Sequence, residues 1–189
     1  TSNCSKTDYN LRAPSSRNPK DFWNYSGKDY AGTWKLREKG QPFFTVYNIG
    51  DSHESRAFGD PKDESVDPEK MILAPYHPDL PEMRNTYAKY SSAISKMDSL
   101  VGQAIENLKQ DGLYENTIIV YNSDHGGVLA RSKRFLYSSG IHCPLIVRIP
   151  EQMKHLYPQG KSPGSTIDRI VSFIDMPKTW ISLTRAEMK

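Results

Sequence analysis

The sequence contains little that would place it in a specialised class of protein. It has two cysteines in 189 residues, which are too few for a disulfide framework and lack the CxxC spacing of a zinc or redox motif. No apolar run reaches the ~20 residues that a membrane-spanning helix needs. It has no block of lysine and arginine, and its net charge is only +3, so we expect no nucleic-acid partner. No internal repeat or low-complexity segment is found.

What remains is the composition of a globular protein. Hydrophobic residues make up 37% and charged residues 25% of the chain, which is typical of a folded rather than a disordered sequence. The length suits one domain. Residues 1–41 are polar with little periodicity, and residues 54–81 form a proline-rich stretch that we interpret as a long functional or mobile loop.

Hydrophobic patterning predicts an α/β fold. Three short apolar runs indicate buried strands, at 42–50, 116–122 and 143–150. Between the first two runs, apolar residues recur at helical spacing up to Gly112, and Asp79 and Glu82 resemble a capping box at the start of that helix. Pro177 indicates the start of a last helix. This order predicts a mostly parallel sheet flanked by helices.

Polar residues follow two of the predicted strands directly. Asp124 and His125 end the second run and precede two glycines, which is compatible either with an ordinary turn or with a metal or anion site. His53 follows the first run in the same way, and Asp51 could orient its imidazole or cap a turn. Because the carboxyl ends of neighbouring parallel strands meet at one sheet edge, we expect His53 and His125 to lie together.

Two lysines are candidates for binding an anion. Lys133 lies in a basic segment, "RSKRFLYSSG", and Lys6 lies in "NCSKTDYN". Each is compatible with a solvated surface charge. Beside an anion site, each would also be a natural partner for a negatively charged ester.

Four segments, in order, resemble the formylglycine-dependent (type I) sulfatases of the alkaline-phosphatase-like superfamily: "NCSKTDYN", "QPFFTVYNIGDSHES", "NTIIVYNSDHGG" with Lys133 and "GIHCPLIVRIP", and "VSFIDMPKTWISLT". The resemblance implies that Asp124 and His125 bind a divalent metal, usually calcium. It implies that Lys6, His53 and Lys133 contact the sulfate as substrate-binding and catalytic residues. It also places a polar substrate-site residue at Asp8.

The family's nucleophile, a formylglycine made from a Cys/Ser-x-Pro-x-Arg motif, has no counterpart in the sequence. We therefore interpret residues 1–189 as the C-terminal half of a sulfatase catalytic domain, truncated at both ends and inactive alone. The parent enzyme is expected to hydrolyse sulfate esters of a small molecule or carbohydrate and to be periplasmic or secreted.

Two other interpretations stay open at this point. One is a phosphodiesterase or phosphomutase of the same superfamily, in which His142 could be a further metal ligand. The other is a non-catalytic binding module derived from the fold. The sequence does not indicate the oligomeric state or the particular sulfated substrate.

Overall fold

The computed structural model describes residues 1–4, 6, 23–27, 33–57 and 66–184. Asp8 therefore lies outside the described residues. The chain forms two compact units, Thr1–Gln152 and Met153–Lys189. All the candidate site residues that are described belong to the first unit, which contains the strands and the longest helix.

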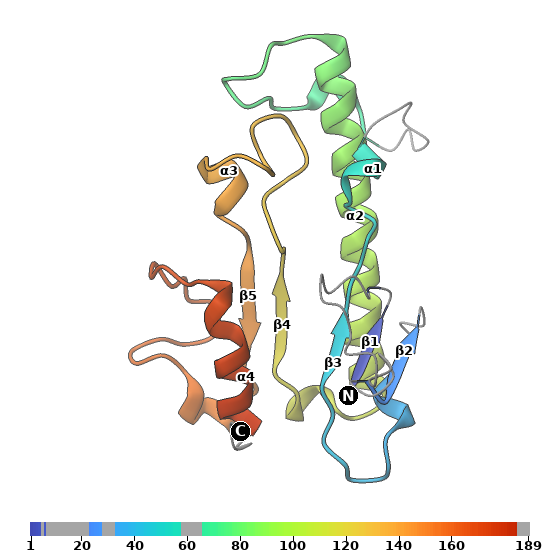
Figure 1. The fold of residues 1–189 in the computed structure, drawn as a ribbon, viewed down its shortest axis with the longest axis vertical. Coiled ribbons are helices and arrows are strands. Elements are labelled where there is room, and N and C mark those ends of the chain that lie inside the picture. The colour runs from blue at the N-terminus through green and yellow to red at the C-terminus, as the bar shows by residue number, and fades with distance from the viewer. Residues whose placement is uncertain (5, 7–22, 28–32, 58–65, 185–189) are drawn as a thin grey trace, which may run out of the picture. The chain divides into compact units, whose positions relative to one another are not determined.

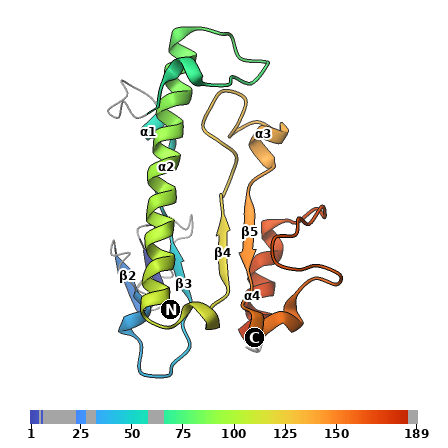
Figure 2. The same cartoon turned by 180° about the vertical axis from the view of Figure 1, so that it is seen from behind.

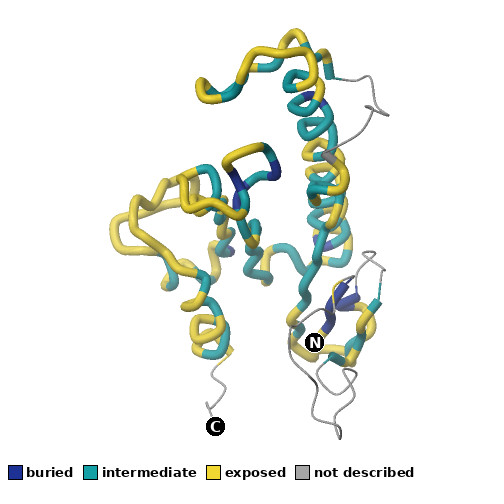
Figure 3. Tube along the Cα trace, turned by 45° about the horizontal axis from the view of Figure 1, so that its top comes forward, coloured by how far each residue is buried: buried dark blue, intermediate teal, exposed yellow. Residues whose placement is uncertain are grey.

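The first unit contains a three-stranded parallel sheet (Figure 1). Strand β1 (Ser2–Cys4) lies in the middle and pairs in parallel with β2 (Tyr25–Gly27) and β3 (Thr45–Tyr47). β1 is buried along its whole length, and it is dark blue in Figure 3. This parallel arrangement confirms the predicted fold class, although the polar amino-terminal residues did not predict the first two strands.

Hydrogen bonds explain how the polar strand β1 can be buried. The Ser2 hydroxyl bonds with the hydroxyls of Thr33 at 2.7 Å and of Thr45 at 2.9 Å. The amide of Asn48 donates to Asn3 Oδ1 at 2.8 Å. Because a buried polar group is costly unless it is hydrogen-bonded, these partners from three later segments make the central strand possible.

The other two strands form a separate pair. β4 (Ile119–Asn122) and β5 (Leu145–Arg148) are antiparallel, with Val120 opposite Val147. The prediction placed them in a parallel arrangement, and for this pair it was wrong. A parallel return needs a long crossover connection, usually a helix. Here the connection turns back through a loop and the four-residue helix α3 (Ser138–Ile141), so the chain re-enters beside β4 in the opposite direction.

The long helix α2 (Pro81–Gln110) is the predicted one (Figure 2). It begins at Pro81, whose missing N–H costs nothing in the first turn. It is followed by Gly112, which has a φ of 67° as expected for a residue just after a helix. The predicted capping box does not form, because Leu80 occupies the N-cap position without a side-chain cap. Asp79 instead accepts two hydrogen bonds from Arg84, at 2.5 and 2.7 Å.

α2 holds the loops of the first unit in place. Its Met97 sulfur accepts hydrogen bonds from Ser52 at 3.6 Å and from Tyr121 at 3.7 Å, so it joins the segment after β3 to strand β4. Asp111, at the end of α2, accepts a hydrogen bond of 2.7 Å from the indole of Trp34. The short helical elements of this unit are η2 (Thr33–Leu36), α1 (Glu54–Ala57), η3 (Pro68–Lys70) and η4 (Tyr114–Asn116), while η5 (Glu151–Leu156) crosses the boundary between the units.

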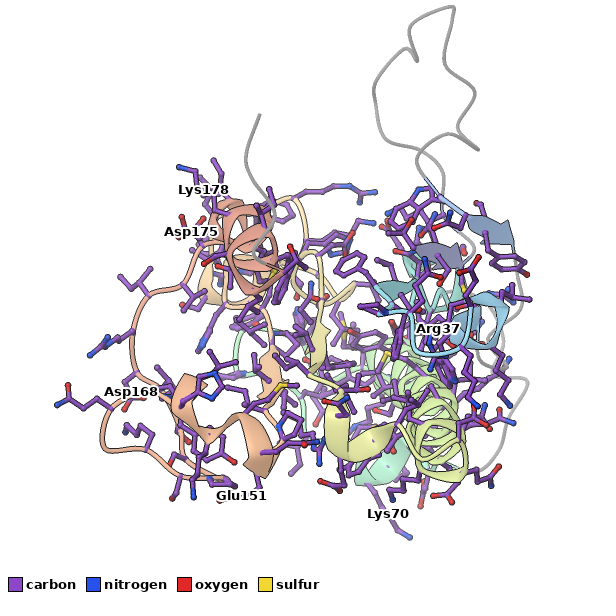
Figure 4. The ribbon with its side chains drawn as sticks, turned by 90° about the horizontal axis from the view of Figure 1, so that it is seen from below. Arg37, Lys70, Glu151, Asp168, Asp175 and Lys178 are labelled. Atoms are coloured by element: carbon purple, nitrogen blue, oxygen red, sulfur yellow. The ribbon has the colours of Figure 1, made fainter. Side chains whose placement is uncertain are left out.

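The second unit has little buried surface among its described residues. It contains η6 (Phe173–Asp175) and α4 (Met176–Thr184), with Pro177 in the first turn as predicted. Residues 158–172 are exposed (yellow in Figure 3). The side chains of Asp168, Asp175 and Lys178 are exposed and point away from the ribbon in Figure 4. None of the described helices is long and apolar enough to cross a membrane.

Candidate functional site

The predicted site residues follow the carboxyl ends of three strands. Lys6 comes two residues after β1, His53 six residues after β3, and Asp124 two residues after β4. β1 and β3 are parallel neighbours, so Lys6 and His53 both follow strands that terminate at the same end of one sheet. Asp124 follows a strand of the other sheet, and side-chain contacts rather than strand pairing bring it to this end.

One contact between the segments that follow β1 and β4 is an ion pair between predicted site residues. The Lys6 ammonium lies 3.8 Å from Asp124 Oδ2, and both side chains are more than half exposed. An exposed pair of this kind contributes little to stability. The ion pair matters because it places the ammonium that follows β1 beside the carboxylate that follows β4.

Asp124 and His125 present two ligand atoms to the same space. Asp124 Oδ1 lies 3.6 Å from His125 Nε2, close to the ~3.4 Å expected between adjacent ligand atoms that each lie ~2.4 Å from one calcium ion. His125 Nδ1 lies 2.7 Å from the carbonyl oxygen of Gly126. Since a carbonyl can only accept, Nδ1 carries the proton and the neutral ring keeps a lone pair on Nε2.

These two residues therefore fit a divalent cation as a partial ligand set. Within the described ranges, no group of three or more His, Cys, Asp and Glu side chains is arranged to hold a metal. Burial raises the pKa of the Cys143 thiol, and the negative charge of Asp124 raises it further. The effect of Asp124 on this pKa shows that the Cys143 thiol lies close to the Asp124 carboxylate.

Lys133 is fixed by a residue that the sequence did not single out. Its ammonium lies 2.9 Å from Glu54 Oε2, and both side chains are about four-fifths buried, with 17% and 21% of their surface exposed. Arg134 binds the same carboxylate through two hydrogen bonds of 2.9 and 2.8 Å. The hydrogen bonds from Lys133 and Arg134 lower the pKa of Glu54, and the bond from Lys133 has the larger effect. Glu54 therefore stays ionised and holds both cations.

The contact with Glu54 also brings Lys133 to the segment that carries His53, because Glu54 is the next residue in the chain. The backbone N–H of Ser55 donates to His53 Nδ1 at 3.3 Å, and the Ser55 hydroxyl lies 3.0 Å from the same nitrogen. Since Nδ1 accepts, the neutral ring carries its proton on Nε2. The exposed imidazole of His53 can therefore donate a hydrogen bond from Nε2 to an incoming oxygen.

The loop between β4 and α3 is folded tightly enough to carry both halves of the site. The N–H of Lys133 donates to the carbonyl of Gly127 at 2.9 Å, and the N–H of Gly126 donates to Gly140 at 3.0 Å. A Cβ on Gly126 would lie 2.0 Å from the carbonyl oxygen of Ser139. The absence of a side chain at Gly126 therefore permits this close approach of the backbone segments.

Two residues considered beside the predicted site have other partners. Asp51 forms an ion pair of 2.8 Å with Lys96 of α2, and so anchors the loop before His53 rather than orienting its imidazole. His142 is exposed, and its backbone N–H bonds to Ser138 at 2.8 Å. The structure thus brings Lys6 to Asp124, which also contacts His125, and brings Lys133 to the residue after His53. The missed residue is Glu54, whose pairing across 79 positions leaves no local sequence signal.

Comparison with known proteins places most of the chain in one family. The family model described as "Sulfatase" matches residues 5–186. The ulvan-active sulfatase of Formosa agariphila is 32% identical over 215 aligned positions, covering 94% of this chain and 33% of that protein. The arylsulfatase K of Canis lupus familiaris is 27% identical, covering 57% of this chain and 19% of that protein.

A third relative extends the comparison to another bacterial enzyme. The N-acetylglucosamine-6-O-sulfatase of Bacteroides thetaiotaomicron is 31% identical, covering 52% of this chain and 17% of that protein. The chain thus spans a third or less of the length of each of these relatives. The family match extends over almost the whole chain, including the segments that carry Lys6, His53, Asp124 and Lys133. The chain belongs to the sulfatase family.

Proposed function

We propose that the full-length protein hydrolyses sulfate esters on carbohydrates. Family membership supports this, as do relatives named for their action on ulvan and on N-acetylglucosamine-6-O-sulfate. The observation that carries the proposal is the meeting of Lys6, Asp124 and His125 at the carboxyl end of β1 and β4, with Lys133 held beside the His53 segment. Together these cations and ligand atoms would neutralise the charge of a bound sulfate group.

The lysines would bind the negatively charged oxygens of the sulfate group. The ammonium of Lys133 has three N–H donors. One is directed to Glu54, so two can be directed to sulfate oxygens while the nitrogen stays fixed. Donors that are already in place when charge develops in the transition state require no reorganisation, and this is usually the largest contribution to catalysis.

His53 would act on the oxygen that leaves with the sugar. Its Nε2 carries the proton because Ser55 occupies Nδ1. Donation from Nε2 to the ester oxygen would stabilise the negative charge that develops there as the S–O bond breaks. The backbone hydrogen bond from Ser55 keeps the ring in the tautomer that this role requires.

Asp124 and His125 would hold a divalent cation, which we propose to be calcium as in most of the family. A bound cation supplies Lewis-acid polarisation of a sulfate oxygen. A carboxylate oxygen is a usual calcium ligand, whereas an imidazole is less common. The remaining ligands and the formylglycine would come from residues outside this chain. We propose that residues 1–189 form the later half of the catalytic domain of an exported enzyme.

The test compares two lysine variants of the full-length enzyme. Lys133→Ala should lower kcat/KM for an aryl sulfate by about 10²–10³, the loss typical of removing one preorganised donor. Lys109→Ala is the matched control, because Lys109 lies in the last turn of α2 and contacts Glu106 and Tyr114 instead. If Lys133→Ala keeps more than about a third of the parental activity, the proposed role of Lys133 is wrong.

The same assay distinguishes the other enzyme class. A phosphodiesterase should act on a phosphate diester, and a phosphomutase on a phosphate monoester, in preference to the sulfate ester. We expect the sulfate ester to be the better substrate, because the family match is to sulfatases. Faster turnover of either phosphate ester by the full-length enzyme would overturn the assignment to sulfate esters.

A further inference from the structure

One arginine beside the candidate site is held between two aromatic rings. The guanidinium carbon of Arg131 lies 4.6 Å from the ring centre of Tyr76 and 4.0 Å from that of Tyr137. Tyr137 in turn stacks on Phe135, with ring centres 6.3 Å apart and an interplanar angle of 25°. We call Arg131, Tyr76, Phe135 and Tyr137 the arginine–aromatic cluster.

The cluster lies at the protein surface. Tyr76 is 44%, Tyr137 48% and Phe135 51% exposed, and Arg131 is exposed as well. Contiguous exposed aromatic side chains on a soluble protein commonly mark a binding site. The exposed parts of these aromatic side chains offer an apolar surface against which a sugar ring can pack.

A hydrogen-bonded chain holds one side of the cluster in place. The N–H of Ala74 donates to the Tyr87 hydroxyl at 2.9 Å, and that hydroxyl lies 2.7 Å from His77 Nδ1. His77 Nε2 lies 2.9 Å from the carbonyl oxygen of Ala130, to which it donates. His77 is therefore held between Tyr87 of α2 and Ala130, the residue before Arg131, and it fixes the position of its neighbour Tyr76.

The backbone of Arg131 is also held in an unusual conformation. Its φ is 63°, and among the described non-glycine residues only Arg134 also has a positive φ. A left-handed conformation costs a side-chain-bearing residue about 1 kcal/mol or more, so it persists where the surroundings impose it. Here the Ser139 hydroxyl donates to the Arg131 carbonyl at 2.5 Å, which fixes the residue.

Comparison with Arg148 shows what the Arg131 guanidinium lacks. Arg148 also lies over a tyrosine, 3.7 Å from the ring centre of Tyr114, but its N–H groups bind the Glu115 carboxylate at 2.9 Å and two backbone carbonyls. Within the described ranges, Arg131 forms no ion pair with a carboxylate. Its N–H donors are thus oriented by the rings and available to an outside anion.

We propose that Arg131 binds a second anionic group of the substrate, on a sugar unit next to the one that carries the reacting sulfate. Arg131 is two residues from Lys133, so their Cα atoms are at most ~7 Å apart. The planar guanidinium fits either a carboxylate or a sulfate. The inference rests on the proposed function and narrows its substrate class to anionic oligosaccharides or polysaccharides.

The test uses pairs of substrates with the full-length enzyme. A singly sulfated sugar is compared with one disaccharide that adds a neighbouring carboxylate and with another that adds a neighbouring sulfate. The preference for each doubly charged substrate, expressed as a ratio of kcat/KM values, is measured for the parent and for Arg131→Met. We expect the preference to fall about tenfold or more in the variant, as for the loss of a charged hydrogen bond.

Two further variants separate binding from packing. Arg131→Lys keeps the charge but loses the planar fork, so it should restore the preference only in part. Arg148→Met removes an arginine–tyrosine contact of similar geometry and should leave the preference unchanged, whatever its effect on stability. If Arg131→Met lowers kcat/KM equally for all substrates, Arg131 only ties Tyr76 to the loop and the subsite proposal is wrong.

Direct binding keeps the two proposals distinguishable. If the parent enzyme turns over none of these sugars, the proposed function fails, and calorimetric titration with the doubly charged disaccharides still tests the subsite. Binding that is about tenfold weaker in Arg131→Met supports the subsite, and unchanged binding overturns it. A loss of affinity for one disaccharide alone identifies the anion that Arg131 recognises.

Discussion

Gly126 offers a sharp test of the loop that carries the candidate site. A methyl group at this position would lie 2.0 Å from the Ser139 carbonyl oxygen and 2.6 Å from the Gly140 Cα. Both atoms belong to the backbone, so neither can rotate away as a side chain could. The loop at Gly126 and helix α3 would have to separate by about 1 Å or more, and the 3.0 Å hydrogen bond from the Gly126 N–H to the Gly140 carbonyl would be stretched.

The cost of this separation can be set against a matched glycine. Overpacking of this kind typically destabilises a protein by about 1–3 kcal/mol. In α2, a Cβ on Gly102 would meet nothing within 4 Å, and alanine is favoured over glycine in a helix by about 0.5–1 kcal/mol. The free energies of unfolding of Gly126→Ala and Gly102→Ala should therefore differ by roughly 1.5–4 kcal/mol, with Gly126→Ala the less stable.

Urea unfolding of the full-length protein measures this difference, and a sulfate-ester assay measures its effect on the site. Because Gly126 adjoins His125 and its loop positions Lys133, a displacement of ~1 Å should lower kcat/KM by about 10²-fold. Gly102→Ala should keep parental activity. If Gly126→Ala proves as stable and as active as Gly102→Ala, the close backbone approach inferred for this loop is wrong.

Three further predictions concern charged groups. Glu54→Gln should lower kcat/KM for an aryl sulfate by about 10²-fold because Lys133 loses its fixed position, and Glu54→Asp should restore part of it; equal effects of both changes would contradict a positioning role. The hydrogen bond from Trp34 lowers the pKa of Asp111 in the folded protein. The ionised Asp111 carboxylate therefore stabilises the fold fully above about pH 4, and this stabilisation is lost as the pH falls through the lowered pKa. The difference in the free energy of unfolding between the parent and Asp111→Asn should shrink over the same pH range when unfolding is measured at a series of pH values. Asp124→Ala should weaken calcium binding at least about tenfold by calorimetry, and unchanged affinity would remove Asp124 from the ligand set.

Local patterning was sufficient to predict several elements. The apolar runs predicted β3, β4 and β5, and helical spacing predicted α2 with its end before Gly112. The positions of these elements were predicted because apolar residues concentrate where a strand or helix packs against its neighbours. The predicted burial of the strands was wrong, since no residue of β3, β4 or β5 is buried and Ile146 and Val147 of β5 are 62% and 47% exposed. The prediction of a capping box was wrong because the Asp79 carboxylate accepts two hydrogen bonds from Arg84 instead. The spacing of the residues in the sequence does not reveal this contact.

The candidate site was predicted as a set of residues but not as an arrangement. Lys6, His53, Asp124, His125 and Lys133 were identified from sequence motifs, and the expectation that they share one sheet edge rested on parallel pairing. The structure supplies different links, namely the ion pair from Lys6 to Asp124 and the one from Lys133 to Glu54. Whether these residues act on sulfate stays a prediction that the variants above test.

The sequence by itself thus determined the positions of β3, β4, β5 and α2 and the polar residues that follow β3 and β4, because these depend on neighbours a few positions apart. Tertiary structure alone decided that polar β1 is a central strand, that β4 and β5 run in opposite directions, and that Arg131 lies between Tyr76 and Tyr137. Each of these depends on hydrogen bonds or side-chain contacts between segments distant in the chain. Such pairings follow the path of the folded backbone, and local periodicity carries no information about that path.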